Sequence, residues 1–453
     1  MYFVYSLLLT LTFLVLLPHF FIDAIRHGKY VAGFRERFGK LAPFDNDGKP
    51  VVWLHCVSVG ELQAARPLVQ GIRKRFPDHI LVVSTITLTG QNLAREVFGN
   101  DVAKIFYFPF DWRWTVRRAL NVIRPSAVLV METEIWPGFL RECRAAEVPV
   151  AIVNGRLSRQ SLRRYKWIKG FISRVVSCLS LAVMQTEADA ERIQTLGLPS
   201  TKVFVSGNLK FDAGRMPVRK SLADEFRQRF KLTGTTPVIF AASTHAPEER
   251  LILKAFQELR TVSNPTPRLL MAPRHPERLA EVSSLLASSG LAWVSRSSTI
   301  STLDRQCDVI LLDTIGELQA LYPLASIVFV GGSIAKSGGH NILEPAAVGA
   351  AIVTGAHTRN FDAIVKAFVK ESAIIQLPSL PDSELQIELK HVFTQLLSDS
   401  LRRQELGQRA KTLVEENLGA TERTLTLLDT IISSRNTPNR RSPAVSAEGV
   451  YTA

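Results

Sequence analysis

Short apolar runs alternate along the chain with longer amphipathic stretches. Segments between the runs, such as 61–76 and 112–123, carry apolar residues at helical spacing. Continuous apolar runs separated by helices are typical of parallel strands whose sheet is covered on both faces. The pattern therefore predicts a doubly wound α/β domain. Its strands are expected at residues 51–57, 80–84, 105–108, 127–131, 148–153, 181–184 and 203–205.

The rhythm pauses over the polar segment 211–222 and then resumes, and long helical candidates run from 382 to about 432. The sequence thus predicts a second doubly wound α/β domain over 215–432, after a first over 26–214, with a hinge near 215. Ligands of such sheets bind beyond the carboxyl ends of the strands, so we expect site residues there, facing a cleft between the domains. The later strands are expected at 238–242, 269–271, 292–295, 309–312, 327–330 and 351–353.

Both ends of the chain depart from this rhythm. Residues 2–22 carry no charge and are mostly apolar, and basic residues follow from Arg26 to Lys40. About 20 apolar residues are enough to cross a bilayer core, and a basic flank stays on the cytoplasmic side. We expect residues 1–25 to form a membrane anchor that either spans the bilayer or lies in its interface. Residues 433–453 are polar and lack periodicity, which predicts a disordered tail.

Composition narrows the classes of partner. Fifty-five Lys and Arg against 41 Asp and Glu give a net charge of +14. This excess of positive charge favours an anionic partner. Nucleic acid, a phospholipid surface and a phosphorylated small molecule are the three alternatives. The four cysteines make no CxxC pair, and the nine histidines make no HxxxH or HExxH pattern. The sequence therefore gives no reason to expect a disulfide framework or a metal site.

In the second half, polar or glycine-rich segments follow the predicted strands. Residues 331–341 (GGSIAKSGGHN) lie between a strand and a helical candidate. Their backbone N–H groups could hold a phosphate, although the glycines could equally serve only a tight turn. Glu344 follows in the first helical turn, where it could accept bonds from ribose or complement the helix dipole. Arg274, His275 and residues 243–245 end other strands and could bind a phosphate or a base.

In the first half, acidic residues follow two predicted strands. Ser58 and Glu61 have the spacing of a capping box. The same position places a carboxylate at the ligand-binding end of a strand, where a general base could stand, and the helix dipole is expected to keep it ionised. Glu132 and Glu134 end another strand, and because buried carboxylates are costly we expect them to face the cleft. Lys210 ends the last strand with a positive charge.

Six segments of the chain are similar, in order, to the 3-deoxy-D-manno-octulosonic acid (Kdo) transferase family. They are WLHCVSVGE, METEIWPGFL, NGRLS, SGNLKFD, APRHPER and FVGGSIAKSGGHNILEPA. The family comprises glycosyltransferases that attach Kdo to the lipid A precursor of Gram-negative bacteria, and the resemblance runs to about residue 430. It implies a GT-B fold of two Rossmann-like domains and inverting transfer to lipid IVA. It also implies that the donor, CMP-Kdo, binds mainly to the C-terminal domain, without a metal or other cofactor.

The resemblance also implies roles for individual residues. Glu61 takes the place of the catalytic base, and Glu132 and Lys210 match positions that stabilise the transition state. The chain departs from the family pattern at a few positions, such as Ile342, where proline is common in the glycine-rich loop. The positions implied to contact CMP are Pro273, Arg274, Ile315, Gly316, Glu317, Asn341, Ile342, Leu343 and Glu344.

Together these features predict an enzyme at the cytoplasmic face of the inner membrane, held by a single N-terminal anchor and by anionic phospholipid. Two other interpretations stay open. One is a GT-B enzyme that uses a nucleoside-diphosphate sugar, as another transferase or an epimerase would. The other is a membrane-tethered basic protein that binds nucleic acid. The basic residues are dispersed and partly concentrated beside the anchor, so anionic phospholipid and a phosphorylated acceptor are favoured over nucleic acid.

Overall fold

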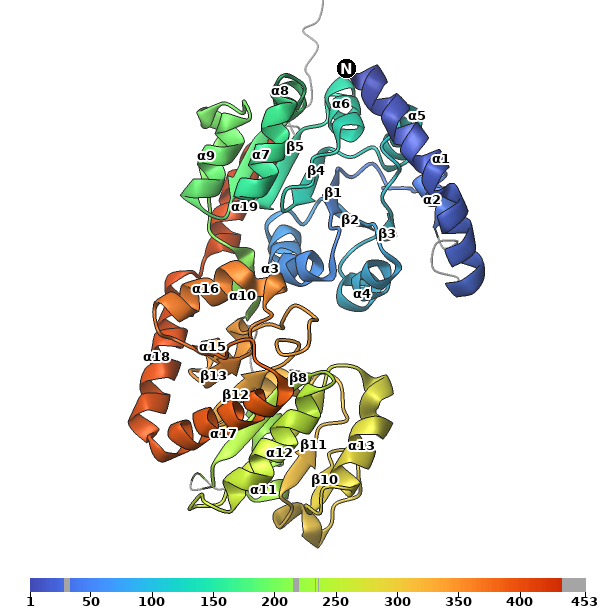
Figure 1. Cartoon of the computed structure of the whole chain (residues 1–453). Helices are drawn as coiled ribbons and strands as arrows, with labels where there is room; N and C mark the ends of the chain where they lie inside the picture. The colour runs from blue at the N-terminus through green and yellow to red at the C-terminus, as the bar shows by residue number, and fades with distance from the viewer. Residues whose placement is uncertain (28–32, 215–219, 233, 235, 434–453) are drawn as a thin grey trace, which may run out of the picture. The chain divides into compact units, whose positions relative to one another are not determined.

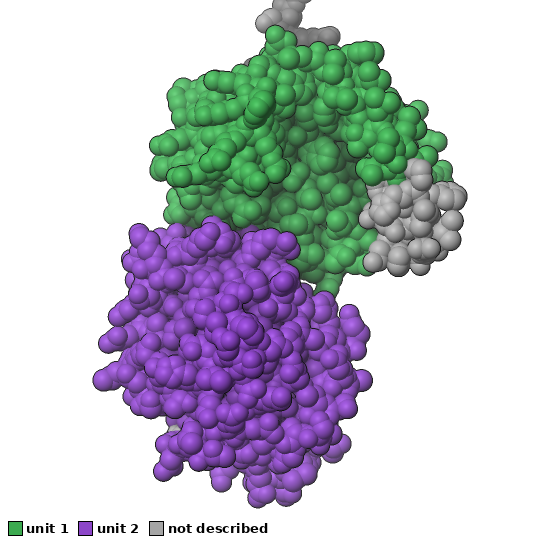
Figure 2. Space-filling model, in the orientation of Figure 1, with its two compact units in different colours: residues 1–209, 419–453 green, residues 210–418 purple. Residues whose placement is uncertain are grey.

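The computed structural model describes residues 1–27, 33–214, 220–232, 234 and 236–433 of the chain. The described residues within 1–209 and 419–453 form one compact unit, and those within 210–418 form a second (Figure 2). Each unit contains a seven-stranded sheet (Figure 1), which confirms the prediction of two parallel α/β domains. The expected hinge at 215 and residues 434–453 of the expected tail lie outside the described residues.

The sheet of unit 1 has the strand order β3-β2-β1-β4-β5-β6-β7, and its pairs are parallel. Strand β1 is fully buried along its length because helices cover both faces of the sheet. The strands are β1 Val51–His55, β2 Ile80–Thr85, β3 Lys104–Tyr107, β4 Ala127–Met131, β5 Val150–Gly155, β6 Leu181–Met184 and β7 Val203–Val205.

Alternate residues of β1 enter two different cores. Val51 and Trp53 pack with α5, α6, α8 and α9, whereas Val52 and Leu54 pack with α3, α4 and α19. This is the period-two alternation of a strand inside a covered sheet. The helices of unit 1 are α1 Tyr2–His27, α2 Phe34–Arg37, α3 Val59–Arg75, α4 Leu88–Phe98, α5 Arg113–Ile123, α6 Pro137–Ala145, α7 Arg159–Trp167, α8 Lys169–Val176, α9 Glu187–Thr195, the 3₁₀ turn Ser200–Lys202 and α19 Ala420–Ile432.

Helix α1 packs on unit 1 through one of its sides. The Tyr5 hydroxyl donates to Asp111 (2.7 Å), and the Trp112 indole N–H donates to the Thr10 hydroxyl (3.0 Å). In the described part of the chain, no helix combines the length and the apolar character needed to cross a membrane. The spanning form of the expected anchor is therefore not confirmed. Apolar side chains on the remainder of α1 are exposed, namely Phe3, Val4, Leu7, Leu8, Leu11, Leu14 and Val15.

Helix α19 returns to unit 1, although the sequence placed all of 215–432 in the second domain. Leu425 and Leu428 join the core formed by β1 and α3. Gly71 of α3 permits this approach, because a Cβ there would come within 2.4 Å of Leu425 Cδ1. Arg75 also donates to Asp429 (2.9 Å). The amphipathic pattern of a helix predicts a buried face but not which sheet that face covers.

The sheet of unit 2 has the strand order β10-β11-β9-β8-β12-β13-β14, again with parallel pairs. Its strands are β8 Val238–Thr244, β9 Arg268–Pro273, β10 Trp293–Ser295, β11 Val309–Leu311, β12 Ile327–Val330, β13 Ala351–Thr354 and β14 Ile375–Gln376. The edge strand β14 has two residues, which is too short for an apolar run to indicate it.

Two helical layers cover this sheet. Residues of α12, α13 and α17 pack on one face, and residues of α11, α14, α15, α16 and α18 pack on the other. The α-helices of unit 2 are α10 Leu209–Gly214, α11 Lys220–Phe230, α12 Glu248–Arg260, α13 Leu279–Ala287, α14 Leu318–Leu321, α15 Leu343–Ala347, α16 Asp362–Lys370, α17 Asp382–Ser398 and α18 Ser400–Glu416. The 3₁₀ turns are Pro276–Arg278, Thr302–Arg305, Tyr322–Leu324 and Arg359–Phe361.

Candidate active site

Glu61 lies at the start of α3, just beyond the carboxyl end of β1. Its carboxylate accepts hydrogen bonds from the Val57 N–H (2.7 Å) and the Ser58 hydroxyl (2.9 Å). The Glu61 N–H in turn donates to the Ser58 hydroxyl (3.3 Å). These contacts fix the position of the carboxylate. Ser58 therefore caps α3 as expected, but the Glu61 carboxylate accepts the Val57 N–H in place of the Ser58 N–H that a full capping box would use. The cap does not exclude a second role for Glu61 as a base.

The pKa of Glu61 is raised to about 7. Burial is the main cause, since the residue is only 5% exposed, and the negative charges of Glu132 and Glu134 raise the pKa further. The hydrogen bonds from Val57 and Ser58 oppose the shift but are outweighed. The expectation of an ordinary, fully ionised carboxylate is therefore wrong. A pKa near the working pH suits a general base better.

Glu132 and Glu134 follow β4, the strand adjacent to β1. Glu132 has a φ of 52°, a left-handed conformation that is uncommon outside glycine. The intervening Thr133 hydroxyl donates to the Arg156 carbonyl (2.6 Å), and the Arg156 N–H donates back to Thr133 (2.9 Å). Burial and the charge of Glu132 raise the pKa of Glu134. The structure thus brings three predicted carboxylates into electrostatic contact at one sheet edge.

Lys210 is the first residue of unit 2 and lies in α10. Its ammonium lies 5.5 Å from the centre of the Phe361 ring, within the range of a cation–π contact. The transition-state role of Lys210 remains a prediction from the resemblance.

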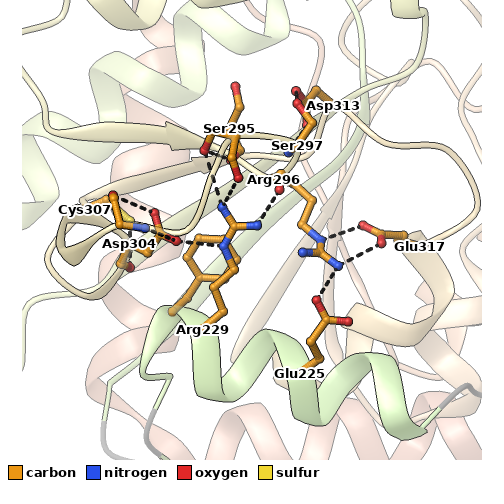
Figure 3. A network of polar contacts seen from close by, with 12 residues as sticks. Glu225, Arg229, Ser295, Arg296, Ser297, Asp304, Cys307, Asp313 and Glu317 are labelled. Atoms are coloured by element: carbon orange, nitrogen blue, oxygen red, sulfur yellow. Dashed lines mark hydrogen bonds and ion pairs between the residues drawn. The ribbon is translucent and has the colours of Figure 1, made fainter.

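Three positions implied to contact CMP, Ile315, Gly316 and Glu317, line one cavity of unit 2. Arg296 holds the Glu317 carboxylate through two N–H groups (3.1 and 3.2 Å), and it also donates to Glu225 (2.8 Å) (Figure 3). Because Glu317 is engaged in this way, we expect it to position the loop rather than to bind a ligand alone. The cavity has a volume of about 490 Å³, a size typical of small-molecule sites. It is lined by Ser221, Leu222, Glu225, Ile315, Gly316 and Glu317.

The remaining predicted CMP residues lie at other strand ends of this sheet. The Asn341 amide donates to Glu344 (3.1 Å), and its oxygen accepts from the Leu343 N–H (3.0 Å). Ile342 and Leu343 have no exposed surface and belong to the core. Their side chains therefore cannot meet a ligand, and a contact at these positions would use the backbone. Pro273 ends β9, and the next N–H, that of Arg274, donates to Thr244 (3.0 Å).

Four N–H groups of the glycine-rich loop are already hydrogen-bonded within the chain and are not available to a phosphate. The Glu248 carboxylate, completely buried at the start of α12, already accepts these bonds. The donors are the N–H groups of Gly332 (2.8 Å), Ser333 (2.9 Å), Ile334 (2.8 Å), Ala335 (3.2 Å) and His245 (2.9 Å). An internal carboxylate thus occupies the place where an anionic ligand was expected.

The sequence pattern does not indicate a role for Glu248 or Arg296. Glu248 opens a helix after Pro247, a common position for an acidic residue, and four of its five partners lie more than 80 residues further along the chain. No local motif marks Arg296 as the partner of Glu317. Among the described residues, no group of three or more His, Cys, Asp or Glu side chains is arranged to hold a metal ion.

A family model described as 3-Deoxy-D-manno-octulosonic-acid transferase (kdotransferase) matches residues 32–213. The 3-deoxy-D-manno-octulosonic acid transferase of Haemophilus influenzae is 34% identical over 405 residues, which cover 89% of this chain and 92% of the relative. The chain belongs to the Kdo transferase family. It is therefore a glycosyltransferase of lipopolysaccharide synthesis, and the resemblance seen in the six segments is confirmed.

Solved structures share the fold of this Kdo transferase. The UDP-GlcNAc 2-epimerase from Neisseria meningitidis bound to UDP-GlcNAc aligns with a TM-score of 0.52 at 14% identity, covering 82% of this chain and 99% of that chain. A glycosyltransferase from Rickettsia africae aligns with a TM-score of 0.53 at 12% identity, covering 85% and 100%. At these identities the likeness concerns the fold, which is of the GT-B type.

Proposed function

We propose that this Kdo transferase moves Kdo from CMP-Kdo to the lipid A precursor lipid IVA, with inversion and without a metal ion. Family membership supports the chemistry. The observation that carries the proposal is the buried, hydrogen-bonded Glu61 carboxylate with a pKa of about 7 at the end of β1. A free sugar hydroxyl is a poor nucleophile at neutral pH, and such a carboxylate can remove its proton.

The reaction is a single displacement. Glu61 takes the proton of the acceptor hydroxyl while the oxygen of that hydroxyl forms a bond to the anomeric carbon of Kdo. The bond between that carbon and the phosphate oxygen breaks, and CMP leaves with the electron pair. Attack and departure on opposite faces invert the anomeric centre. The charges of Glu132 and Lys210 would stabilise the oxocarbenium-like carbon and the departing phosphate respectively.

The raised pKa of Glu61 predicts an acid limb in the pH profile. Because the base must be ionised, kcat/KM should rise with pH through about pH 7. Glu134→Gln removes a negative neighbour that raises this pKa, so its limb should move to lower pH. The exposed Glu187 of α9 supplies a control, and Glu187→Gln should keep the wild-type limb. A Glu134→Gln profile that superposes on wild type would contradict this assignment.

Thermal unfolding with nucleotides tests the donor. A ligand of the native state raises the melting temperature by mass action, so CMP should raise it and UDP should not.

Arg274→Ala should weaken CMP binding by about 1.5–3 kcal/mol if its guanidinium contacts the phosphate. Arg250→Ala removes a surface arginine that pairs with Asp382 (2.7 Å) and should leave CMP binding unchanged. A larger shift with UDP would favour a nucleoside-diphosphate sugar enzyme, and salt-sensitive DNA binding without transfer would favour the nucleic-acid alternative.

We also propose that the exposed apolar side of α1 lies in the cytoplasmic face of the inner membrane, next to anionic phospholipid. Deleting α1 would remove Tyr5 from the buried Asp111, so substitutions on the exposed side are the cleaner test. Phe3, Leu7 and Leu11 changed together to Ser should weaken binding to phosphatidylglycerol vesicles at least about tenfold, since each buried side chain contributes about 1.5–3 kcal/mol.

The matched control for α1 changes exposed apolar residues of unit 2. Ile300, Leu303 and Ile387 are 74%, 58% and 66% exposed, and changing all three to Ser should leave vesicle flotation unchanged. Equal losses in the two triple variants, or no loss in either, would contradict attachment through α1.

A further inference from the structure

Three histidines from different strand ends of unit 2 come together beside the glycine-rich loop. The Nε2 atoms of His245 and His340 lie 2.8 Å apart, and their rings are nearly parallel, with an interplanar angle of 10°. The ring of His275 meets that of His245 edge-on at a centroid distance of 5.0 Å. His245 follows β8, His275 follows β9, and His340 lies in the loop after β12. The carboxyl ends of the central strands thus converge on this cluster.

The backbone around the cluster is held in place on both sides. A register shift in β8 at Ser243, whose φ is 55°, redirects the chain just before His245. The Glu248 carboxylate accepts both the His245 N–H (2.9 Å) and the Gly332 N–H (2.8 Å). Gly332 has a φ of 67°, and a Cβ there would lie 2.8 Å from His340 Nε2. The loop therefore needs glycine at this position for the two rings to meet.

The pKa values of His245 and His340 are both lowered, so the pair does not hold a second proton at neutral pH. Burial lowers the pKa of His245 to about 4 and that of His340 to about 3, and repulsion from His275 and Arg274 contributes to both shifts. Arg278 adds to the effect at His245. Both rings are therefore neutral at pH 7, and the short contact holds one proton between two Nε2 atoms. Positive charges that crowd two neutral rings form an electrostatic pattern that favours the binding of an anion.

The carboxylates around the cluster are already engaged. Glu248 accepts five backbone N–H bonds, and Arg278 pairs with Glu249 (2.6 Å) and Glu281 (3.0 Å). Glu277 lies 3.7 Å from the His275 ring but is largely exposed. Lys336 of the loop is exposed as well. The loop N–H groups bound to Glu248 are not available to a ligand, whereas the imidazoles and Arg274 carry N–H groups that can donate to one.

We propose that the His245–His340 pair, with Arg274 beside it, binds an oxyanion of the nucleotide-linked sugar acid, either its phosphodiester or the carboxylate of the sugar. This inference rests on the proposed role of CMP-Kdo as donor. The oxyanion accepts the Nε2 proton that the rings share. Its charge favours the imidazolium form, so the second Nε2 takes up a proton from solvent and donates as well. Such charge-assisted hydrogen bonds are about twice as strong as neutral ones.

Calorimetric titration of the full chain with cytidine, CMP and free Kdo tests the pair. We expect wild type to bind CMP at least about tenfold more tightly than cytidine. If the anion is the phosphodiester, His245→Gln and His340→Gln each lose most of this advantage and keep cytidine affinity. If it is the carboxylate, they keep CMP affinity and lose Kdo affinity about tenfold. The control is His391→Gln, because His391 lies on α17 and contacts Gln395 (2.8 Å).

Wild type supplies a second readout that does not depend on the folding of a variant. Titrations at about pH 6 in two buffers of different ionisation enthalpy should show proton uptake with CMP or with Kdo and none with cytidine. Variants that bind CMP and Kdo as wild type does, or the absence of proton uptake with either anion, would overturn the proposal. If wild type binds cytidine and CMP equally poorly, the donor proposal fails and this inference falls with it.

Discussion

Glu61→Gln is expected to reduce kcat by roughly 10²–10⁴-fold, the usual contribution of a general base. Affinity for CMP should stay at the wild-type value, because CMP is expected to bind unit 2 and Glu61 belongs to unit 1. The melting temperature should not fall by more than a few degrees. Ionising a carboxyl whose native pKa is raised from 4.5 to about 7 opposes folding above about pH 5. The neutral amide avoids that cost.

Ser58→Ala is the matched control for Glu61. It removes the hydroxyl that caps α3 but leaves the carboxylate, so it should cost about 1 kcal/mol of stability and keep most of the turnover. Steady-state kinetics and thermal melts of both variants separate the two roles. If Glu61→Gln loses stability and retains turnover, the residue is a cap alone and the assignment of the base is wrong.

Glu248→Ala is expected to cause the largest loss of stability in unit 2, about 3–5 kcal/mol. The substitution leaves five backbone N–H groups without their acceptor, each worth about 1–3 kcal/mol when buried, partly relieved by water. The stability of Glu248→Gln should lie between those of wild type and Glu248→Ala, since the amide oxygen can accept some of the five N–H bonds. The control is Glu384→Ala, because Glu384 also lies in a first helical turn but is exposed.

Hydrogen–deuterium exchange reports the effect of Glu248 at the N–H groups themselves. Peptides covering residues 331–341 should lose protection in Glu248→Ala and keep it in Glu384→Ala. Thermal melts should show the same order of variants. Unchanged exchange in Glu248→Ala would mean that the loop is held by its other contacts.

Much of the fold could be predicted because covered parallel sheets require continuous apolar strands. The long strand β8 and the buried strand β1 satisfy that rule and were found from the pattern. Strand β14 was missed because two residues carry no periodicity. Helix α19 was assigned to the wrong unit because the partner of its leucines lies on α3, some 350 residues away in the chain. Local pattern specifies elements better than it specifies their partners.

The candidate site divides in the same way. The Ser58–Glu61 spacing correctly indicated the cap, because that interaction is local. The pKa of about 7 could not be predicted, since it depends on burial and on carboxylates that follow another strand. The glycine-rich loop suggested N–H groups that could hold a phosphate, but four of them bind Glu248 of the same chain. In both cases a contact between residues far apart in the chain determines a property that the local motif does not specify.

The most direct test of the central claim is the mass of the lipid product. CMP-Kdo is first generated in situ, EDTA is then added in excess, and the purified full chain and lipid IVA follow. We predict that wild type adds whole Kdo residues to the lipid and releases one CMP for each, and that Glu61→Gln adds none. Lipid of unchanged mass with the wild-type enzyme, while CMP-Kdo is merely hydrolysed, would contradict the account.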